Sequence, residues 1–193
     1  MEISITDKRT RILLAAVKVF SEKGFHHAKV EEIAERAGVG KGTVYEYFKS
    51  KEELFAEMFK AGTTFYMQKL TDELNNTKSA ADKILKIIDI HFRFMTDHRD
   101  LARLIMQEHR EVGKYLSDFM HEQRMAKIKM LESIVTDGIK QGEIEVVNPH
   151  VTAALIFGMI MAASGMYVFS PHAPSKDEIL ASTREVLFKG ILK

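Results

Sequence analysis

Apolar residues recur at helical spacing along the whole chain, and no segment alternates with the period of two that marks a β-strand. The first repeat lies at residues 12–20 and ends at Gly24, a residue type that commonly terminates helices. Further helices are expected at 30–37, 41–48, 51–75, 79–97, 101–111, 114–140, 149–169 and from 176 onward. The sequence therefore predicts an all-α protein.

Three of these helices begin with recognisable caps. Ser50 and Glu53 form an S-x-x-E capping box, in which serine accepts from the backbone and glutamate reaches back. A second box begins at Ser175, and Asn148-Pro149 supplies an N-cap followed by a proline at the first helical position. These signals fix where the helices start.

The stretch "GVGKGTVY" at residues 38–45 suggests a loop that holds phosphate. A nucleotide-binding P-loop needs G-x-x-x-x-G-K-[ST] after a strand. Here Gly42 follows Lys41, Glu35 occupies the first glycine position, and a helix precedes the loop. These differences exclude a P-loop.

A helix-turn-helix explains the same stretch better. Residues 31–48, "EEIAERAGVGKGTVYEYF", give an apolar-faced helix, a tight turn at Gly38 and a second helix. Val39, Val44 and Phe48 are expected to pack inward. The residues left facing out are Lys41, Gly42, Thr43, Tyr45 and Tyr47. Hydroxyls, a lysine and a helix N-terminus suit a DNA backbone, although the residues alone also allow a surface turn with two half-buried tyrosines.

The segments "RILLAAVKVFSEKGF", "IAERAGVGKGTVYEYF" and "KSKEELF" resemble the N-terminal DNA-binding domain of the TetR family of bacterial repressors. The resemblance covers about residues 9–59. It implies a three-helix DNA-binding head at 1–50 and an effector-binding and dimerisation domain at 51–193. It also implies that the second short helix enters the major groove. The residues that it assigns to DNA are Lys29, Lys41, Gly42, Thr43, Tyr45, Tyr47 and Lys51.

Two positions depart from the family pattern. Ala28-Lys29 stands where the family usually has threonine or serine, which removes a side-chain N-cap and a hydroxyl for phosphate. Lys29 is expected to compensate for this loss electrostatically. Gly40 replaces a common serine N-cap, which is a modest loss because glycine is tolerated there. Glu46 either accepts from a cytosine amino group or points to solvent.

The segment 151–169, "VTAALIFGMIMAASGMYVF", carries no charge. By length it could span a membrane, but Lys and Arg do not flank it and the surrounding sequence is amphipathic. Ala154, Gly158 and Ala162 recur every four residues and allow a second helix to approach closely. The resemblance implies that the last two long helices pair with those of a second subunit. A homodimer without a membrane span is therefore expected.

The helices between 79 and 140 are expected to enclose a small hydrophobic effector. The candidate pocket residues are His91, Phe92, Met95, Leu104, Ile105, Glu108, Phe119 and Met120. Any one of the apolar members is also explained as ordinary core. The segments "QEHREV" and "TDGIKQGEI" look most like regulators of fatty-acid degradation that respond to long-chain acyl-CoA.

Composition narrows the remaining classes of function. The chain has no cysteine, which excludes disulfides and thiolate metal sites, and its eight histidines show no metal-ligand spacing. Because the net charge is only +1, the basic groups that contact DNA must be concentrated on one part of the surface. The N-terminus lacks a signal-peptide core, so a cytoplasmic location is expected. We therefore predict a repressor that binds a palindromic operator and uses no cofactor; a membrane-associated sensor and an enzyme with a hydrophobic substrate are the alternatives.

Overall fold

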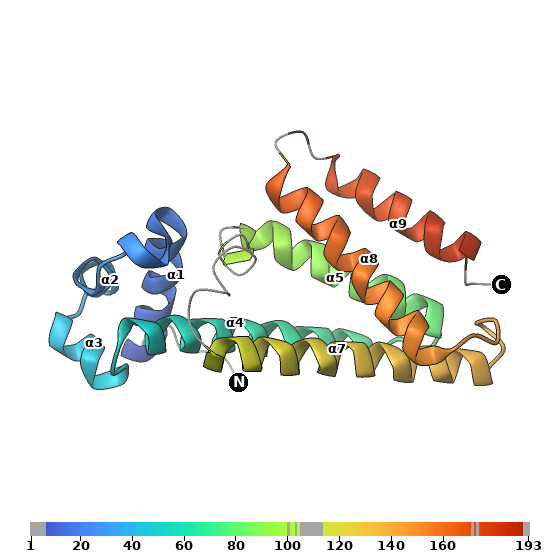
Figure 1. Cartoon of the computed structure of the whole chain (residues 1–193), viewed down its shortest axis with the longest axis horizontal. Helices are drawn as coiled ribbons and strands as arrows, with labels where there is room; N and C mark the ends of the chain where they lie inside the picture. Colours follow the sequence, from blue (N-terminus) through green and yellow to red (C-terminus); the bar gives the residue numbers. More distant parts are fainter. Residues whose placement is uncertain are drawn as a thin grey trace. The chain divides into compact units, whose positions relative to one another are not determined.

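The computed structural model describes residues 7–99, 101, 102, 104, 114–170, 172 and 174–190. In these residues the chain forms helices and no strand, which confirms the all-α prediction (Figure 1). The helices are α1 Lys8–His27, α2 Val30–Ala37, α3 Lys41–Tyr47, α4 Lys51–Leu74, α5 Ala80–Asp97, α7 Lys114–Lys140, α8 Pro149–Phe169 and α9 Lys176–Gly190. Most of the helix expected at 101–111 falls outside the described residues.

The contacts among Cα atoms divide the chain into two compact units. The first holds the described residues of Met1–Phe65 and Asp100–Ser117, and the second holds those of Tyr66–Arg99 and Asp118–Lys193. Helix α4 is continuous and contributes to both units. The domain boundary predicted after residue 50 differs from this division and stays a prediction.

The first unit is built around aromatic side chains from α1 and α4. The rings of Phe20 and Phe55 meet edge-on at 4.9 Å between centroids, and Phe25 lies 5.0 Å from Phe55. Phe59 continues the cluster at 4.8 Å from Phe55. Gly24, inside α1, has a φ of 72°, a conformation that glycine adopts readily, and the resulting kink turns Phe25 into this core. Burial of these rings fixes α1 on α4.

The turn between α2 and α3 is a Schellman motif. Gly38 has a φ of 66°, its N–H donates to the carbonyl of Glu35, and the N–H of Val39 donates to the carbonyl of Ala34. Val44 of α3 and Phe48 just after it are buried, as the sequence predicts, whereas Val39, also expected to pack inward, is half-buried. The motif therefore sets the angle at which α3 leaves α2.

The second unit packs α5, α7, α8 and α9 together with the end of α4. Helix α8 contacts α5 and α9, and α9 also contacts α5. A Cβ atom on Gly138 of α7 would lie 2.7 Å from the Cβ of Ala80 and 2.7 Å from Cδ1 of Ile144. A glycine is therefore needed at 138 for the start of α5 to approach α7.

The predicted caps are present. Ser50 accepts from the N–H of Glu53 at 3.1 Å, and Glu53 reaches back to the N–H of Lys49. Ser175 and Glu178 form a complete capping box, and Asn148 caps α8 by accepting from the N–H of Val151 at 3.1 Å. The cap signals in the sequence therefore mark the starts of α4, α8 and α9.

Candidate nucleic-acid interface and effector cavity

Helix α3 exposes the face that the sequence assigns to DNA. Tyr45 and Tyr47 are 43% and 41% exposed, and Lys41 and Gly42 are also exposed, while Thr43 is half-buried. Gly40 occupies the N-cap of α3 and Lys29 that of α2, and neither cap makes a side-chain hydrogen bond. The first amides of both helices are thus left without a capping side chain, as the departures at Lys29 and Gly40 predict.

Ion pairs between helices hold this face in place. Arg36 of α2 pairs with Glu22 of α1 at 2.7 Å, and Lys41 of α3 pairs with Glu31 of α2. The hydrogen bond from Lys41 lowers the pKa of the Glu31 carboxyl. Lys41 also lies over the ring of Tyr45, 5.9 Å from its centroid. These pairs are exposed and salt-sensitive, so they orient α3 more than they stabilise the fold.

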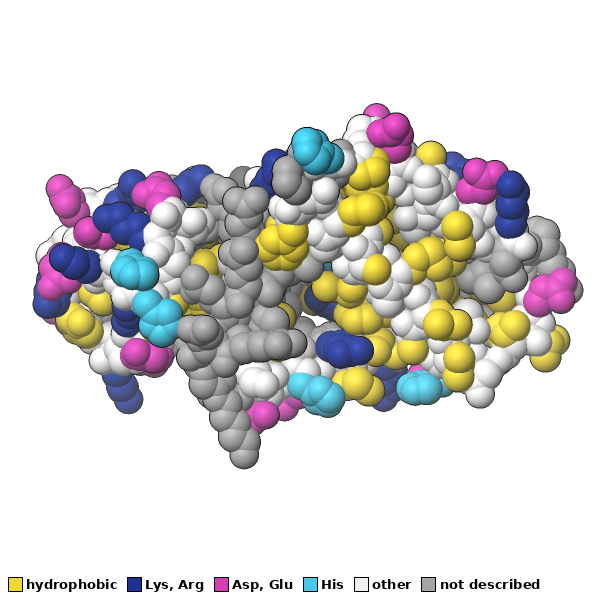
Figure 2. All heavy atoms as spheres, turned by 45° about the horizontal axis from the view of Figure 1, so that its top comes forward, with side chains coloured by type: hydrophobic (Ala, Val, Ile, Leu, Met, Phe, Trp, Pro, Cys, Tyr) yellow, Lys and Arg dark blue, Asp and Glu magenta, His cyan; other side chains and the backbone are white. Residues whose placement is uncertain are grey.

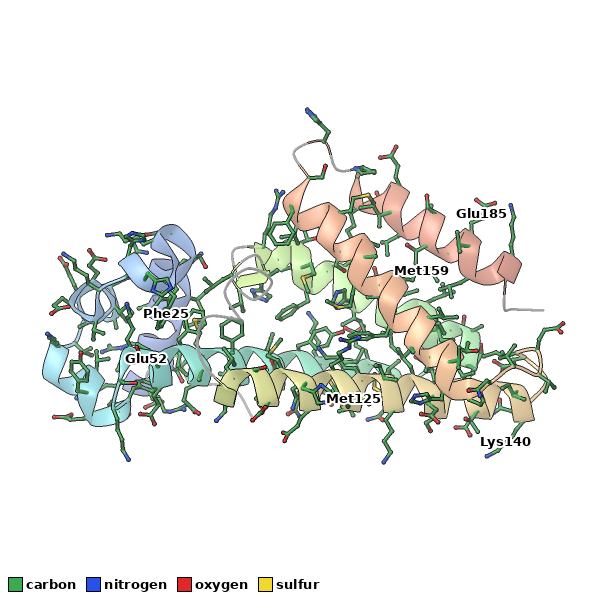
Figure 3. All side chains as sticks on the ribbon, viewed as in Figure 1. Phe25, Glu52, Met125, Lys140, Met159 and Glu185 are labelled. Atoms are coloured by element: carbon green, nitrogen blue, oxygen red, sulfur yellow. The ribbon has the colours of Figure 1, made fainter. Side chains whose placement is uncertain are left out.

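Lys51 is held by the end of α1. Its ammonium donates to the carbonyl oxygens of Phe25, His26 and Ala28 at 2.8, 3.3 and 3.2 Å. It also lies 4.6 Å from the centroid of the Phe25 ring, and Figure 3 shows Phe25 at the end of α1 beside the first turn of α4. An ammonium has three donors, and three carbonyls lie within their reach. Contact between Lys51 and a DNA phosphate stays a prediction, and the structure gives this residue a role in the protein itself.

A small, partly enclosed cavity lies in the second unit, between the end of α4 and helices α5, α7 and α8. Its residues are Tyr66, Leu70, Ile87, His91, Lys127, Met130, Leu131, Phe157, Ile160 and Met161. Its volume is about 20 Å³, enough for about one water molecule. Most of the lining is apolar, and two of its side chains are flexible methionines.

Three polar side chains meet in this cavity. The hydroxyl of Tyr66 lies 3.4 Å from Nδ1 of His91, and the ammonium of Lys127 lies 4.9 Å from the centroid of the Tyr66 ring. Burial lowers the pKa of His91 to about 3, helped by the nearby charge of Lys127, so this imidazole is neutral at pH 7. Burial also lowers the pKa of Lys127 and raises that of Tyr66.

The exposed face of α8 is apolar. Ala154, Gly158 and Ala162 are all exposed, and a Cβ on Gly158 would meet no atom within 4 Å. The neighbouring Val151 and Leu155 are 52% and 67% exposed. Figure 2 shows hydrophobic side chains spread over the α8 and α9 side of this unit. The residues predicted for the dimer interface thus share one uncovered face of this chain.

Comparisons with known proteins match both parts of the chain. Residues 12–58 match the family described as bacterial regulatory proteins, tetR family, and residues 77–165 match a tetracyclin repressor-like C-terminal domain. The fatty acid metabolism regulator protein of Bacillus subtilis (strain 168) is 30% identical over 185 residues, which is 95% of each chain. The chain belongs to the TetR family. It is therefore a DNA-binding transcriptional regulator, as the sequence predicts.

Two solved TetR-like structures share its fold. The transcriptional regulator FadR from Bacillus subtilis, in complex with stearoyl-CoA, has a TM-score of 0.83 and 29% identity and covers 93% of this chain and 97% of its own. The fatty acid degradation regulator FadR from Bacillus halodurans has a TM-score of 0.82 and 24% identity and covers 93% and 94%. The second likeness shows the fold alone.

In this TetR-family chain the residues predicted to bind the effector lie in different places. His91 lines the cavity, whereas Phe92 and Met95 are buried on α5 outside its lining. Phe119 and Met120 are half-buried on α7, and Leu104 is buried in the first unit. Ile105 and Glu108 lie outside the described residues. Their roles in effector binding stay predictions.

Sequence reasoning missed Tyr66, Lys127 and Phe157 as cavity residues. The sequence carries only a weak signal for these three residues. Lys127 lies at helical spacing from Leu131 and Val135, which are both buried, so it belongs to the apolar stripe of α7. A lysine at such a position is usually explained by its apolar stem alone.

A membrane span and a metal centre are the two other kinds of site that bear on the function. Among these residues, α8 is the one helix long and apolar enough to cross a membrane, a test that the core helix of a soluble protein also passes. Within the same ranges, no three His, Cys, Asp or Glu side chains gather closely enough to hold a metal ion. The relatives are transcriptional regulators, which favours neither a membrane sensor nor an enzyme.

Proposed function

We propose that this protein is a cytoplasmic repressor that binds a palindromic operator as a homodimer and releases it when a hydrophobic effector enters the second unit. The observation that carries the proposal is the 30% identity, over 95% of each chain, to a fatty acid metabolism regulator. Long-chain acyl-CoA is the candidate effector, because the FadR structure of similar fold holds stearoyl-CoA.

The exposed face of α3 supports the part of the proposal that concerns DNA. In a helix-turn-helix the second helix enters the major groove, where its first residues meet base edges and phosphates. Lys41, Thr43 and Tyr45 occupy that part of α3, with a cation, a hydroxyl and an aromatic ring. A symmetric dimer places two such helices about 34–36 Å apart, so its operator must be a palindrome.

The face of α8 supports the dimer. A row of large apolar side chains on this helix is exposed to solvent, namely Val151, Leu155, Met166 and Phe169. An exposed apolar patch of this kind marks an interaction surface. Small residues at 154, 158 and 162 let the matching helix of a second copy approach closely.

The cavity supports an effector whose binding changes the conformation. At about 20 Å³ it is far smaller than an acyl chain, so α5, α7 and α8 must separate when such a chain enters. Met130 and Met161 have the flexible side chains that this change requires. Because α4 contributes residues to both units, we propose that its movement changes the spacing of the two recognition helices.

The test begins with operator selection from a random DNA pool. The selected DNA is labelled and its fluorescence anisotropy is followed during titration with palmitoyl-CoA. We expect salt-sensitive binding to a palindrome, release by palmitoyl-CoA and no release by coenzyme A alone. Tighter DNA binding with palmitoyl-CoA would show a co-repressed regulator instead. Binding that is indifferent to DNA sequence would contradict the proposal.

A further inference from the structure

Among the described residues, the cation of this cavity has no counter-ion. None of the described lining residues is acidic, and Lys127 forms no ion pair with any described residue. Its one assigned partner is the face of the Tyr66 ring. Lys127 is half-buried, and partial removal of an ammonium from water without an anion beside it lowers its pKa.

The same cavity holds an unused hydrogen-bond donor. His91 is 5% exposed, and its Nε2 is buried without a partner. If the Tyr66 hydroxyl donates to Nδ1, then Nε2 carries a proton that no group accepts. If Nδ1 donates instead, the Tyr66 hydroxyl keeps the unused proton. Either tautomer therefore leaves one donor without an acceptor among the described residues, on a side chain that lines the same cavity as Lys127.

We propose that this cavity binds the carboxylate of a free fatty acid, with Lys127 as counter-ion and the Tyr66–His91 pair as hydrogen-bond donor. A carboxylate supplies what the cluster lacks, a negative charge and acceptor oxygens. The cavity has room for about one water molecule, so α5, α7 and α8 must separate to admit the acid, and its apolar lining residues Met130, Phe157 and Met161 would then surround the chain. The inference goes beyond the proposed acyl-CoA response, because it assigns a second class of ligand.

The charge of the ligand head decides between the two classes. A thioester or methyl ester offers a neutral carbonyl, which accepts a hydrogen bond but leaves the ammonium uncompensated. A carboxylate compensates it and favours the protonated form of Lys127. The cluster should therefore select an acid over its own ester when the chains are identical.

The experiment compares dodecanoate, methyl dodecanoate and dodecanoyl-CoA by isothermal titration calorimetry. The wild type is measured against Lys127→Met, which keeps the apolar stem, and against Lys129→Met, which removes an exposed lysine from the same helix. We expect Lys127→Met to weaken dodecanoate binding by about tenfold or more and to leave methyl dodecanoate unchanged. We expect Lys129→Met to bind all three ligands as the wild type does.

Equal dodecanoate affinity in the wild type and Lys127→Met would overturn the inference. So would an equal loss of dodecanoate and dodecanoyl-CoA affinity, since the cluster would then recognise a carbonyl without regard to charge. If the protein prefers dodecanoate to its ester but acyl-CoA does not release the operator, only the proposed function is contradicted.

A second measurement uses the unmodified protein, in case Lys127→Met does not fold. The carboxyl signal of [1-¹³C]dodecanoate is followed by NMR while the pH is lowered. Beside Lys127 the bound carboxyl should stay ionised to a lower pH than the free acid does. A bound acid that titrates like the free one would overturn the inference.

Discussion

The ammonium of Lys51, in the first turn of α4, lies 2.8 Å from the carbonyl oxygen of Phe25 near the end of α1. The carbonyls of His26 and Ala28 lie within hydrogen-bond distance of the same ammonium. The end of a helix leaves carbonyls without partners, and a cation there also interacts favourably with the negative end of the helix dipole. Lys51 therefore joins α1 to α4 at the base of the DNA-binding head.

Lys51→Met should destabilise this head. Hydrogen bonds to a charged group contribute about 1.5–3 kcal/mol, so we expect a loss of that size in the free energy of unfolding measured with urea. Lys49→Met is the matched control, because the side chain of Lys49 is exposed. Equal stability of Lys51→Met and the wild type would remove the structural role.

The same variant separates that role from a DNA contact. If Lys51 also grips a phosphate, as the resemblance to the TetR family implies, Lys51→Met lowers the slope of log affinity against log salt by about one unit. If its role is structural alone, affinity falls with the stability of the head while the slope is unchanged. Anisotropy of labelled operator DNA at several salt concentrations measures both quantities.

Lys41 should contact the DNA backbone. Its side chain is exposed on α3 and its partner Glu31 is exposed on α2, so Lys41→Met should change stability little. We expect weaker binding to specific and random DNA alike, with a salt slope smaller by about one unit. Lys18→Met, on the exposed face of α1, serves as control. An unchanged slope would place Lys41 away from the phosphates.

Gly158→Leu should disrupt the dimer. The Cβ of a residue at 158 meets no atom of its own chain within 4 Å, so the substitution fits the isolated chain and acts on a partner helix. Sedimentation velocity should show more monomer, and operator affinity should fall in parallel. Ala126→Leu, on an exposed part of α7, should change neither. A wild type that sediments as a stable monomer would end this interpretation.

Gly138→Ala should destabilise the second unit. The added methyl would lie 2.7 Å from atoms of Ala80 and Ile144, and overpacking of this kind costs about 1–3 kcal/mol. The control is Gly42→Ala in α3, where the added Cβ meets nothing within 4 Å and helix propensity favours alanine. Thermal unfolding should show a lower midpoint for Gly138→Ala alone. A midpoint at or above that of the wild type would contradict the close packing.

Local signals in the sequence were enough to predict where the described helices begin and turn, whereas the DNA-binding head was predicted from the resemblance to the TetR family. Asn148-Pro149 predicts the start of α8, and Gly38 predicts the turn before α3, because caps and turns depend on a few neighbouring residues. The inward positions of Val44 and Phe48 follow from helical spacing, and both are buried.

The cavity could not be predicted in the same way. Its lining comes from α4, α5, α7 and α8, and the rotation of each helix decides which residues meet. Phe92 and Met95 share α5 with His91 but pack elsewhere, because a helix buries more than one face. Lys127 and Tyr66 approach one another across 61 residues, a distance over which spacing rules give no information.

The most direct test of the central claim is thermodynamic linkage between DNA and effector. Palmitoyl-CoA binding is measured by isothermal titration calorimetry with and without saturating operator DNA, and operator binding is measured with and without palmitoyl-CoA. For a repressor released by its effector, operator DNA must raise the Kd of palmitoyl-CoA by the same factor by which palmitoyl-CoA raises the Kd of the operator. We expect an increase of about 5–150-fold, the usual range of such coupling. An effector Kd that is unchanged or lowered by operator DNA would contradict release by palmitoyl-CoA.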